Sequence, residues 1–421
     1  MNLIIATGIY PPDIGGPATY SKKIAEEFSR RGWDVKIITY ANLRECESES
    51  MRNDANKIVR ISKAHNVMTR YFLYTWNLIK LAKNADLIYA QGPVSEGLPV
   101  FIASKVTGRK YILRIGGDTV WERFLSKKQQ NKKAKKQMDI DDMDVETRPA
   151  CAGRFIASER TFIALDEFQN AKGLPWNMRI LKWIKRFVAR HAVKIIVPSK
   201  CLEKTVAMWG VDTGKIKVIY NSAEEGNWQI PNSKFQISKV GEGDIILSAG
   251  RLITLKGFDA LIDLMPKLLE VNKNFKLVIV GDGPKMASLK SNVQSQKSYD
   301  NKIILTGKME HNELLQYMQK AEIFVLNSCY EGLSNTVIEA MQSGLPCAVS
   351  NVGGNPELVE NEKSGLLFEY NNKEQIKQAI ARLWRDVELR KIIIAGGFEK
   401  VKEFSYERMI DDTEEILNSK F

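Results

Sequence analysis

Short apolar runs alternate with amphipathic stretches along most of the chain. The runs, rich in Val, Ile and Leu, predict buried strands, and stretches with apolar residues three or four positions apart predict helices. The predicted strands are LIIAT, DVKIIT, KIVRIS, ADLIYA, KYILRI, VKIIVPS and KIKVIY, followed by DIILSAG, FKLVIVG, KIILTG, EIFVLNS, PCAVS and GLLF. This alternation predicts two Rossmann-like, doubly wound α/β domains with parallel sheets.

The pattern breaks at two places. Residues 223–243 lack periodicity and are rich in Gly, Pro, Ser and Asn, which predicts a linker between domains at 1–222 and 244–398. Residues 126–150 are Lys-rich and then Asp-rich, which is typical of a mobile charged insertion. DxD pairs within 139–144 resemble metal ligands, but acidic residues beside lysines are more often a solvated charge patch, so we expect no metal site.

Composition places the chain among ordinary soluble proteins, with 421 residues and 44% hydrophobic content. No run approaches the roughly 18 apolar residues of a membrane span, and the N-terminus lacks the features of a signal peptide. The five cysteines are odd in number and form no CxxC pair, which fits reduced thiols. We therefore expect a cytoplasmic protein.

The net charge of +12 is unevenly distributed. Residues 1–222 carry 38 Lys and Arg against 22 Asp and Glu, whereas residues 223–421 carry 24 against 28. A basic first half predicts an anionic surface or acceptor as its partner. Nucleic acid is not expected, because the basic residues belong to no recognisable reader module and show no regular interleaving with aromatic residues.

The stretch YEGLSNTVIEAMQSGLP, which follows a predicted strand, carries the first candidate site. Ser334 and Asn335 are favoured N-cap residues, and the N-terminus of the helix that they begin attracts phosphate. Glu331 precedes this helix and Glu339 lies about one turn inside it, so both carboxylates flank the same loop. Carboxylates suit the hydroxyl groups of a nucleotide-sugar, although, for this pair taken alone, a Glu331 on a solvated loop and a Glu339 in a surface salt bridge are the favoured explanation.

Two further loops follow predicted strands. Arg251 and Lys256 come after DIILSAG and could clamp a diphosphate, and the alternative of two surface bases is weakened because cations are disfavoured at helix N-termini. Gly15 and Gly16 follow the first strand, where glycines let backbone N–H groups approach a phosphate or a sugar. A tight loop without a ligand would look the same.

Together these motifs resemble the retaining glycosyltransferase family 4, whose members have the GT-B fold of two Rossmann-like domains facing across a cleft. The resemblance covers nearly the whole chain. The motifs that carry it are the Gly15–Gly16 loop, AGRLITLKGFDALI, VGDGP at 280–284, Glu331 with seven residues before Glu339, and FSYERM at 404–409.

The resemblance implies roles for these residues. Arg251 and Lys256 would hold the donor diphosphate, Glu331 would contact the donor sugar, and Glu339 would contact the ribose. Residues 399–421 would form a C-terminal helix that returns to the N-terminal domain. The other donor-binding residues that it implies are Gly307 and Lys308 near the nucleobase, and Gly332, Leu333, Ser334 and Asn335 in the phosphate cradle.

One segment departs from the family pattern. Family members commonly have a His after the fifth strand of the first domain, whereas this chain has Asp118 in YILRIGGDTVWERF. Asp118 could accept a hydrogen bond from a donor hydroxyl or act on the acceptor. It could also be the N-cap of the helix at TVWERF, and the two roles can coexist.

Residues 176–192 predict a basic amphipathic helix. Such a helix can lie on an anionic bilayer, or its apolar side can pack on the first sheet. Because a strand follows at once, we expect the apolar side to pack on the sheet and the basic side to face solvent, available to the inner surface of the cell membrane.

The family resemblance implies a metal-independent retaining hexosyltransferase without a cofactor. Its donor would be a UDP-, GDP- or ADP-sugar, and its acceptor a glycan or a lipid-linked sugar, in surface polysaccharide or glycolipid synthesis. Two alternatives remain: a sugar-nucleotide epimerase or hydrolase on the same fold, and a non-catalytic nucleotide-sugar-binding protein.

Overall fold

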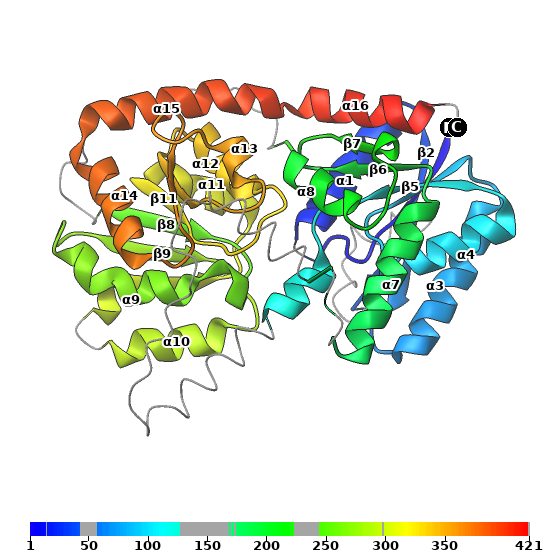
Figure 1. Ribbon diagram of the computed structural model, residues 1–421, viewed down its shortest axis with the longest axis horizontal. Helices are drawn as coiled ribbons and strands as arrows, with labels where there is room; N and C mark the ends of the chain where they lie inside the picture. Colours follow the sequence, from blue (N-terminus) through cyan, green and yellow to red (C-terminus); the bar gives the residue numbers. More distant parts are fainter. Residues whose placement is uncertain are drawn as a thin grey trace. The chain divides into compact units, whose positions relative to one another are not determined.

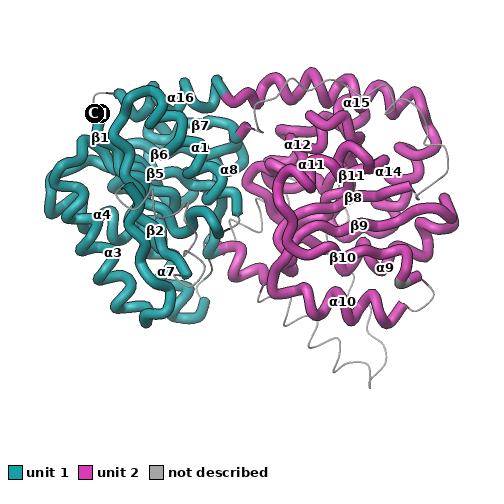
Figure 2. The backbone as a smooth tube through the Cα atoms, turned by 180° about the vertical axis from the view of Figure 1, so that it is seen from behind, with its two compact units in different colours: residues 1–120, 169–221, 407–421 teal, residues 121–168, 222–406 magenta. Residues whose placement is uncertain are grey.

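The chain forms two compact units in a computed structural model (Figure 2). Unit 1 comprises residues 1–120, 169–221 and 407–421, and unit 2 comprises residues 121–168 and 222–406. The structure describes residues 1–13, 15–42, 57–126, 168–169, 171, 174–222, 244–296 and 299–419. The predicted linker and the predicted insertion from residue 127 onward, including the DxD pairs, lie outside the described residues.

Unit 1 is built on a seven-stranded parallel sheet in the order β3-β2-β1-β4-β5-β6-β7 (Figure 1). Its central strands are buried on both faces, as expected where helices cover both sides of a parallel sheet. The strands are β1 (Asn2–Ala6), β2 (Asp34–Ala41), β3 (Ile58–Ser62), β4 (Leu87–Ala90), β5 (Lys110–Arg114), β6 (Lys194–Val197) and β7 (Ile216–Val218).

The helices of unit 1 cover the two faces of this sheet. A C-terminal segment joins them, because Arg31, the residue after α1, forms ion pairs with Asp411 (2.8 Å) and Glu414. The Tyr20 hydroxyl of α1 also lies 3.5 Å from that of Thr413. The helices are α1 (Gly16–Arg30), α3 (Val67–Ala82), α4 (Gly97–Thr107), α7 (Trp176–His191), α8 (Lys200–Ala207) and α16 (Tyr406–Asn418).

Unit 2 repeats this architecture with a six-stranded parallel sheet in the order β10-β9-β8-β11-β12-β13. Its strands are β8 (Ile245–Ala249), β9 (Lys276–Val280), β10 (Ile303–Gly307), β11 (Ile323–Leu326), β12 (Cys347–Ser350) and β13 (Leu366–Phe368). Its helices are α9 (Phe258–Leu269), α10 (Met286–Ser295), α11 (His311–Lys320), α12 (Asn335–Gln342), α13 (Asn355–Leu358), α14 (Lys373–Arg385) and α15 (Val387–Val401).

Every apolar run that predicts a strand forms one, so the prediction of two parallel α/β sheets is confirmed. In each sheet the strand order reverses once, between β1 and β4 in unit 1 and between β8 and β11 in unit 2. Loops that follow the strands on either side of such a reversal turn to opposite faces of the sheet, and ligands of open α/β sheets bind there.

The orientation expected for α7 is only partly right: Ile184, Phe187 and Val188 pack on the core of unit 1 as expected, but two lysines and two tryptophans are reversed. Lys182 and Lys185 point inward and are only 8% and 1% exposed, whereas Trp176 and Trp183 are 73% and 60% exposed. The cause is a charge inside unit 1, because the Lys185 ammonium pairs with the buried Asp118 carboxylate and lies 4.3 Å from the centre of the Trp209 ring. Within the described residues, no helix is both long and apolar enough to cross a bilayer.

Candidate functional site

The predicted phosphate-binding loops of unit 2 follow the two strands at which its sheet reverses. β8 leads into Arg251 and a 3-10 turn at Thr254–Lys256, and β11 leads into the loop that carries Glu331. Because β8 and β11 are hydrogen-bonded neighbours, both loops lie at the same point of the carboxyl edge. A backbone hydrogen bond from Cys329 N to Leu255 O, 2.8 Å long, joins them.

Lys256 and Glu331 form an ion pair across this point. Their side chains are 17% and 11% exposed, so the pair is mostly shielded from water while still reachable from solvent. Arg251 lies on the same loop as Lys256 and is exposed. The structure thus brings together two of the residues predicted to contact the donor, with a second cation on the same loop as Lys256.

Helix α12 begins directly after this pair. Ser334 is its N-cap residue, but the Ser334 hydroxyl lies 3.1 Å from the Thr336 hydroxyl and makes no capping hydrogen bond. The N-terminus of a helix carries a partial positive charge and N–H groups without intrahelical partners. Gly332, with the buried Leu333, joins Glu331 to this N-terminus, and the half-buried Glu339 lies one turn inside the helix.

Asn327, which the sequence reasoning missed, fixes the turn that presents Lys256. This fully buried side chain at the end of β11 donates to the Gly257 carbonyl at 3.0 Å and to the Asn371 side chain at 2.7 Å. Gly257 has φ 57°, and a Cβ there would lie 2.5 Å from the Asn327 carbonyl oxygen. The one sequence signal is a polar residue that ends the apolar run EIFVLNS.

Gly353, also missed, supports Glu331 from the loop after β12. It has φ 56°, and a Cβ at this position would lie 1.9 Å from the Glu331 carbonyl oxygen. The neighbouring Gly354 donates its N–H to that oxygen at 3.1 Å. Only glycine fits, because the backbone conformation is left-handed and the approach is close. A Gly-Gly pair after a predicted strand could have pointed to this loop.

The predicted nucleobase residues end β10, two strands away from β8. Gly307 has φ 80° and accepts a 3.0 Å hydrogen bond from the Gly281 N–H, while Lys308 is exposed. They share the carboxyl edge with Arg251 and Glu331, although no described contact joins the two groups. Gly15 and Gly16 begin α1 and belong to unit 1.

The reversal point of the unit 1 sheet holds a buried acid that the sequence reasoning missed. Glu96, after β4, is 4% exposed, and its carboxyl group is hydrogen-bonded by the Ser95 hydroxyl and by the Gly8 backbone N–H, which follows β1. Burial raises the pKa of this carboxyl, and these hydrogen bonds, with one from the backbone N–H of Glu96 itself, only partly oppose the effect. Glu96 also lies against Gly92, where a Cβ would come within 2.7 Å of its Oε1.

Asp118 is completely buried. One carboxylate oxygen accepts a 3.1 Å hydrogen bond from Val120 N at the start of the helix at 119–126, which is the N-cap geometry expected from the sequence. The other oxygen pairs with Lys185, and burial lowers the pKa of that ammonium. Asp118 therefore connects the residues that follow β5 to α7 within unit 1, and its role toward a donor or an acceptor stays a prediction.

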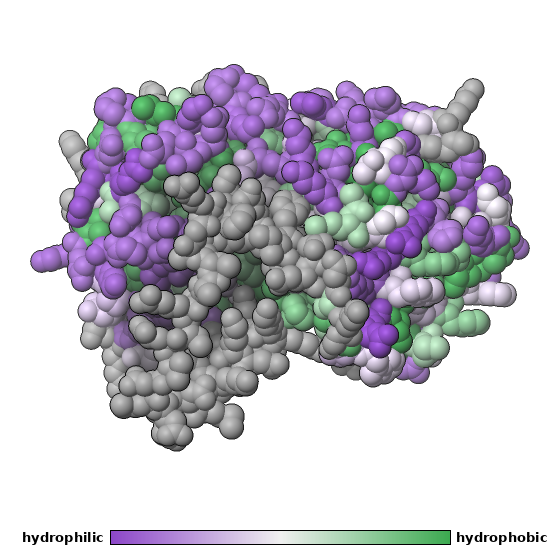
Figure 3. Space-filling view, viewed as in Figure 1, coloured by the Kyte–Doolittle hydropathy of each residue, from purple (hydrophilic) through white to green (hydrophobic). Residues whose placement is uncertain are grey.

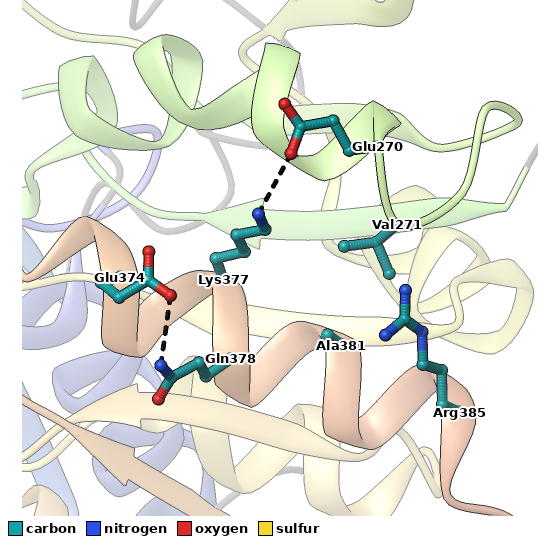
Figure 4. A pocket seen from close by; sticks show the side chains of 7 residues that line it. All are labelled: Glu270, Val271, Glu374, Lys377, Gln378, Ala381 and Arg385. Carbon is teal, nitrogen blue, oxygen red and sulfur yellow. Dashed lines mark hydrogen bonds and ion pairs between the residues drawn. The ribbon is translucent and has the colours of Figure 1, made fainter.

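A shallow cavity of about 370 Å³ lies away from this site (Figure 4). Three of its charged side chains have partners in the lining, with Lys377 3.1 Å from Glu270 and Glu374 3.1 Å from Gln378, and Arg385 also lines it. Glu270 directly follows α9 and precedes β9, so the cavity belongs to the amino edge of the sheet. Among the described residues, no group of three or more His, Cys, Asp or Glu side chains has the arrangement of a metal site.

Family models match both halves of the chain. The model described as glycosyl transferase 4-like domain matches residues 15–222, and the one described as glycosyl transferases group 1 matches residues 229–400. The chain belongs to the group 1, family-4-like glycosyltransferases.

Relatives within this glycosyltransferase family are distant. An uncharacterized glycosyltransferase of Methanocaldococcus jannaschii is 29% identical over 232 residues, 53% of this chain and 59% of its own length. The UDP-Gal:α-D-GlcNAc-diphosphoundecaprenol α-1,3-galactosyltransferase of Escherichia coli is 29% identical over 237 residues, 53% of this chain and 61% of its own length. The chain thus spans less than two thirds of either relative.

A solved structure matches the fold over both whole chains. Anabaena HepE in complex with UDP-glucose covers 100% of both chains with a TM-score of 0.73 and 16% sequence identity. This likeness, with the two parallel sheets described above, shows that the chain has the GT-B fold.

The Asp118–Lys185 pair predicts a large effect on stability. Lys185→Met removes the cation that contacts a buried carboxylate, so the free energy of unfolding should fall by about 3 kcal/mol. The double variant Asp118→Asn/Lys185→Met removes both charges and should recover most of that loss. Urea unfolding measures both, with the exposed Lys22→Met as the control. Equal losses in the single and double variants would contradict the assigned coupling.

Glu96 predicts a pH-dependent stability. Its folded-state pKa lies above the ordinary value of 4.5, so the stability it contributes is full below pH 4.5 and is lost as the pH rises through the folded-state pKa. Glu96→Gln cannot ionise, so its free energy of unfolding should increase relative to the native protein between pH 5 and pH 8. A tenfold change in proton affinity corresponds to about 1.4 kcal/mol. Chemical denaturation at several pH values tests this, with the exposed Glu26→Gln expected to show no such trend.

Proposed function

We propose that this protein is a metal-independent retaining glycosyltransferase that moves a hexosyl group from a nucleotide-diphospho-sugar to a glycan or lipid-linked acceptor. The observation that carries the proposal is the Lys256–Glu331 pair at the reversal point of the unit 2 sheet, beside the N-terminus of α12. The names of the matched proteins support the substrate class, since one uses UDP-Gal and a diphosphoundecaprenol-linked sugar and another binds UDP-glucose.

In the proposed reaction, the bond between the anomeric carbon and the diphosphate oxygen breaks, and the nucleoside diphosphate leaves with the electron pair. An acceptor hydroxyl oxygen forms the new bond to the anomeric carbon on the same face, and its proton passes to an oxygen of the leaving phosphate. Negative charge develops on the diphosphate. Arg251, Lys256 and the N-terminus of α12 would stabilise that charge, which lowers the barrier.

The Lys256–Glu331 pair suits a site that binds both the phosphate charge and the sugar hydroxyl groups of a donor. An ammonium group has three donors, so Lys256 can contact a phosphate oxygen and still orient Glu331. The Glu331 carboxylate has acceptor positions left for the hydroxyl groups of the donor sugar, and Glu339 would accept from the ribose in the same way. Asn327 and Gly353 would act as positioning residues, because they fix the loops that carry Lys256 and Glu331.

Donor binding should appear as a thermal shift. At a ligand concentration of about 100 times Kd, the added stability is about 2.7 kcal/mol, which raises the melting temperature by roughly 5–10 °C for a unit of this size. A panel of UDP-, GDP- and ADP-sugars should give this shift with one nucleotide class, and Arg251→Ala and Glu339→Ala should each abolish most of it.

Arg385→Ala is the matched control for this panel, because Arg385 is an exposed arginine of unit 2 that lines the cavity at the opposite edge of the sheet. It should keep the full shift. If Arg385→Ala lost the thermal shift and Arg251→Ala kept it, the donor would bind in that cavity rather than at the proposed site. No shift with any donor would remove the proposed function.

The mechanism predicts the product. Transfer in the presence of EDTA should proceed at the same rate as without it, and proton NMR of the new glycoside should show the anomeric configuration of the donor. An inverted product would exclude the same-face transfer, and loss of activity restored by Mg²⁺ or Mn²⁺ would exclude metal independence. Free sugar or a changed donor sugar formed without acceptor would favour a hydrolase or an epimerase.

A further inference from the structure

Helices α3, α4 and α7 form one layer on the sheet of unit 1. They connect β3 to β4, β4 to β5 and β5 to β6, and these crossovers all run in the same direction along the sheet order. Right-handed crossovers in one direction put their helices on the same face. α4 packs against both neighbours (Figure 1). Its Phe101 ring lies 4.8 Å from the Phe187 ring of α7.

Each of these helices has an inner stripe that contributes to the core of unit 1. The inner stripes include Tyr74 and Leu78 of α3, Val100 and Ala103 of α4, and Val188 and Ala189 of α7, all fully buried. The core is therefore filled without the other sides of the helices. Any apolar side chain on those outer sides needs a separate explanation.

The outer sides are strongly apolar. Nine of the twelve large hydrophobic side chains that are exposed in the described residues lie on these three helices. They recur at helical spacing, so each helix presents a stripe, and Figure 3 shows hydrophobic residues gathered over the region of α3 and α4. We name as the α3–α4–α7 face the exposed residues Val67, Met68, Phe72, Trp76, Ile102, Val106, Trp176, Ile180 and Trp183.

The charges on these helices have one sign. They contain eight Lys or Arg residues, two in α3, one in α4 and five in α7, and no Asp or Glu. Lys182 and Lys185 are buried, whereas Lys80, Lys105 and Arg179 are exposed. The Lys80 ammonium lies 5.2 Å from the centre of the Trp76 ring, so cationic and aromatic groups share the same surface.

We propose that the α3–α4–α7 face docks on the surface of a bilayer that contains anionic lipid. Tryptophan and other large apolar side chains settle at the level of the headgroups, and Lys and Arg beside them contact lipid phosphates. The complete lack of acidic residues on three adjacent helices fits a polyanionic plane better than a protein partner, whose rim would pair charges of both signs. This proposal is independent of the donor site.

Co-sedimentation of the full chain with phosphatidylcholine vesicles, with and without phosphatidylglycerol, tests this proposal. The protein should bind only the anionic vesicles, and added salt should weaken binding because it screens the charges. Two variants separate the contributions: Phe72→Ser/Trp176→Ser/Trp183→Ser removes aromatic groups, and Lys80→Gln/Lys105→Gln/Arg179→Gln removes charge. Each should lower the partition coefficient by about tenfold or more.

The matched control is Ile304→Ser/Ile392→Ser/Lys290→Gln, which removes two exposed isoleucines and one exposed lysine from unit 2. It should bind anionic vesicles like the native protein. Circular dichroism melting confirms that all variants fold, and the donor thermal shift should be unchanged in them. No binding to anionic vesicles at low salt, or equal binding by the face variants, would overturn the proposal. Sedimentation analysis without lipid gives one more opposing outcome. If the native protein were an oligomer and only the face variants were monomers, the α3–α4–α7 face would bind a second copy, and the proposal would be overturned.

Discussion

The reversal of strand order in each parallel sheet is the constraint on which the rest of the structure depends. Right-handed crossovers send the helices after β8 and after β11 to opposite faces, so the loops of these two adjacent strands diverge at the carboxyl edge. Because the two loops diverge, contacts between their side chains, rather than helix or strand hydrogen bonds, must hold them in place. Lys256 and Glu331 meet there, and the same reversal in unit 1 holds the buried Glu96.

Buried polar residues make this edge a rigid support. Asn327 connects the Lys256 turn to Asn371, and the Ser350 hydroxyl accepts from Ser328 N at 3.0 Å and donates to Ser328 O at 2.7 Å. Such groups would destabilise the unit if they had no partners, so their mutual hydrogen bonds restrict each loop to one conformation. A site for a charged donor benefits, because its dipoles and cations are already oriented before the ligand arrives.

The sequence predicts the strands well but not the residues that hold the loops of the site in place, and the reason is physical. A strand buried on both faces requires a continuous apolar run, which is a local signal. Asn327 and Gly257 are 70 positions apart, and Lys256 and Glu331 are 75 apart, so only the folded sheet shows that they touch. The inward position of Lys182 and Lys185 in α7, which the sequence did not predict, has the same origin. The periodicity of α7 reveals two sides, but the choice between them depends on Asp118, 67 positions before Lys185.

The C-terminal part of α16 belongs to unit 1 although almost all of unit 2 precedes it in the chain. Arg31, directly after α1, has two of its carboxylate partners on this helix, and the Tyr20 hydroxyl of α1 lies beside Thr413. On the ribosome, unit 1 therefore emerges first but is completed last, after about four hundred residues have been synthesised. The surface of α1 that α16 later covers must avoid aggregation throughout that interval. Unit 1 is therefore translated before unit 2 but completed after it.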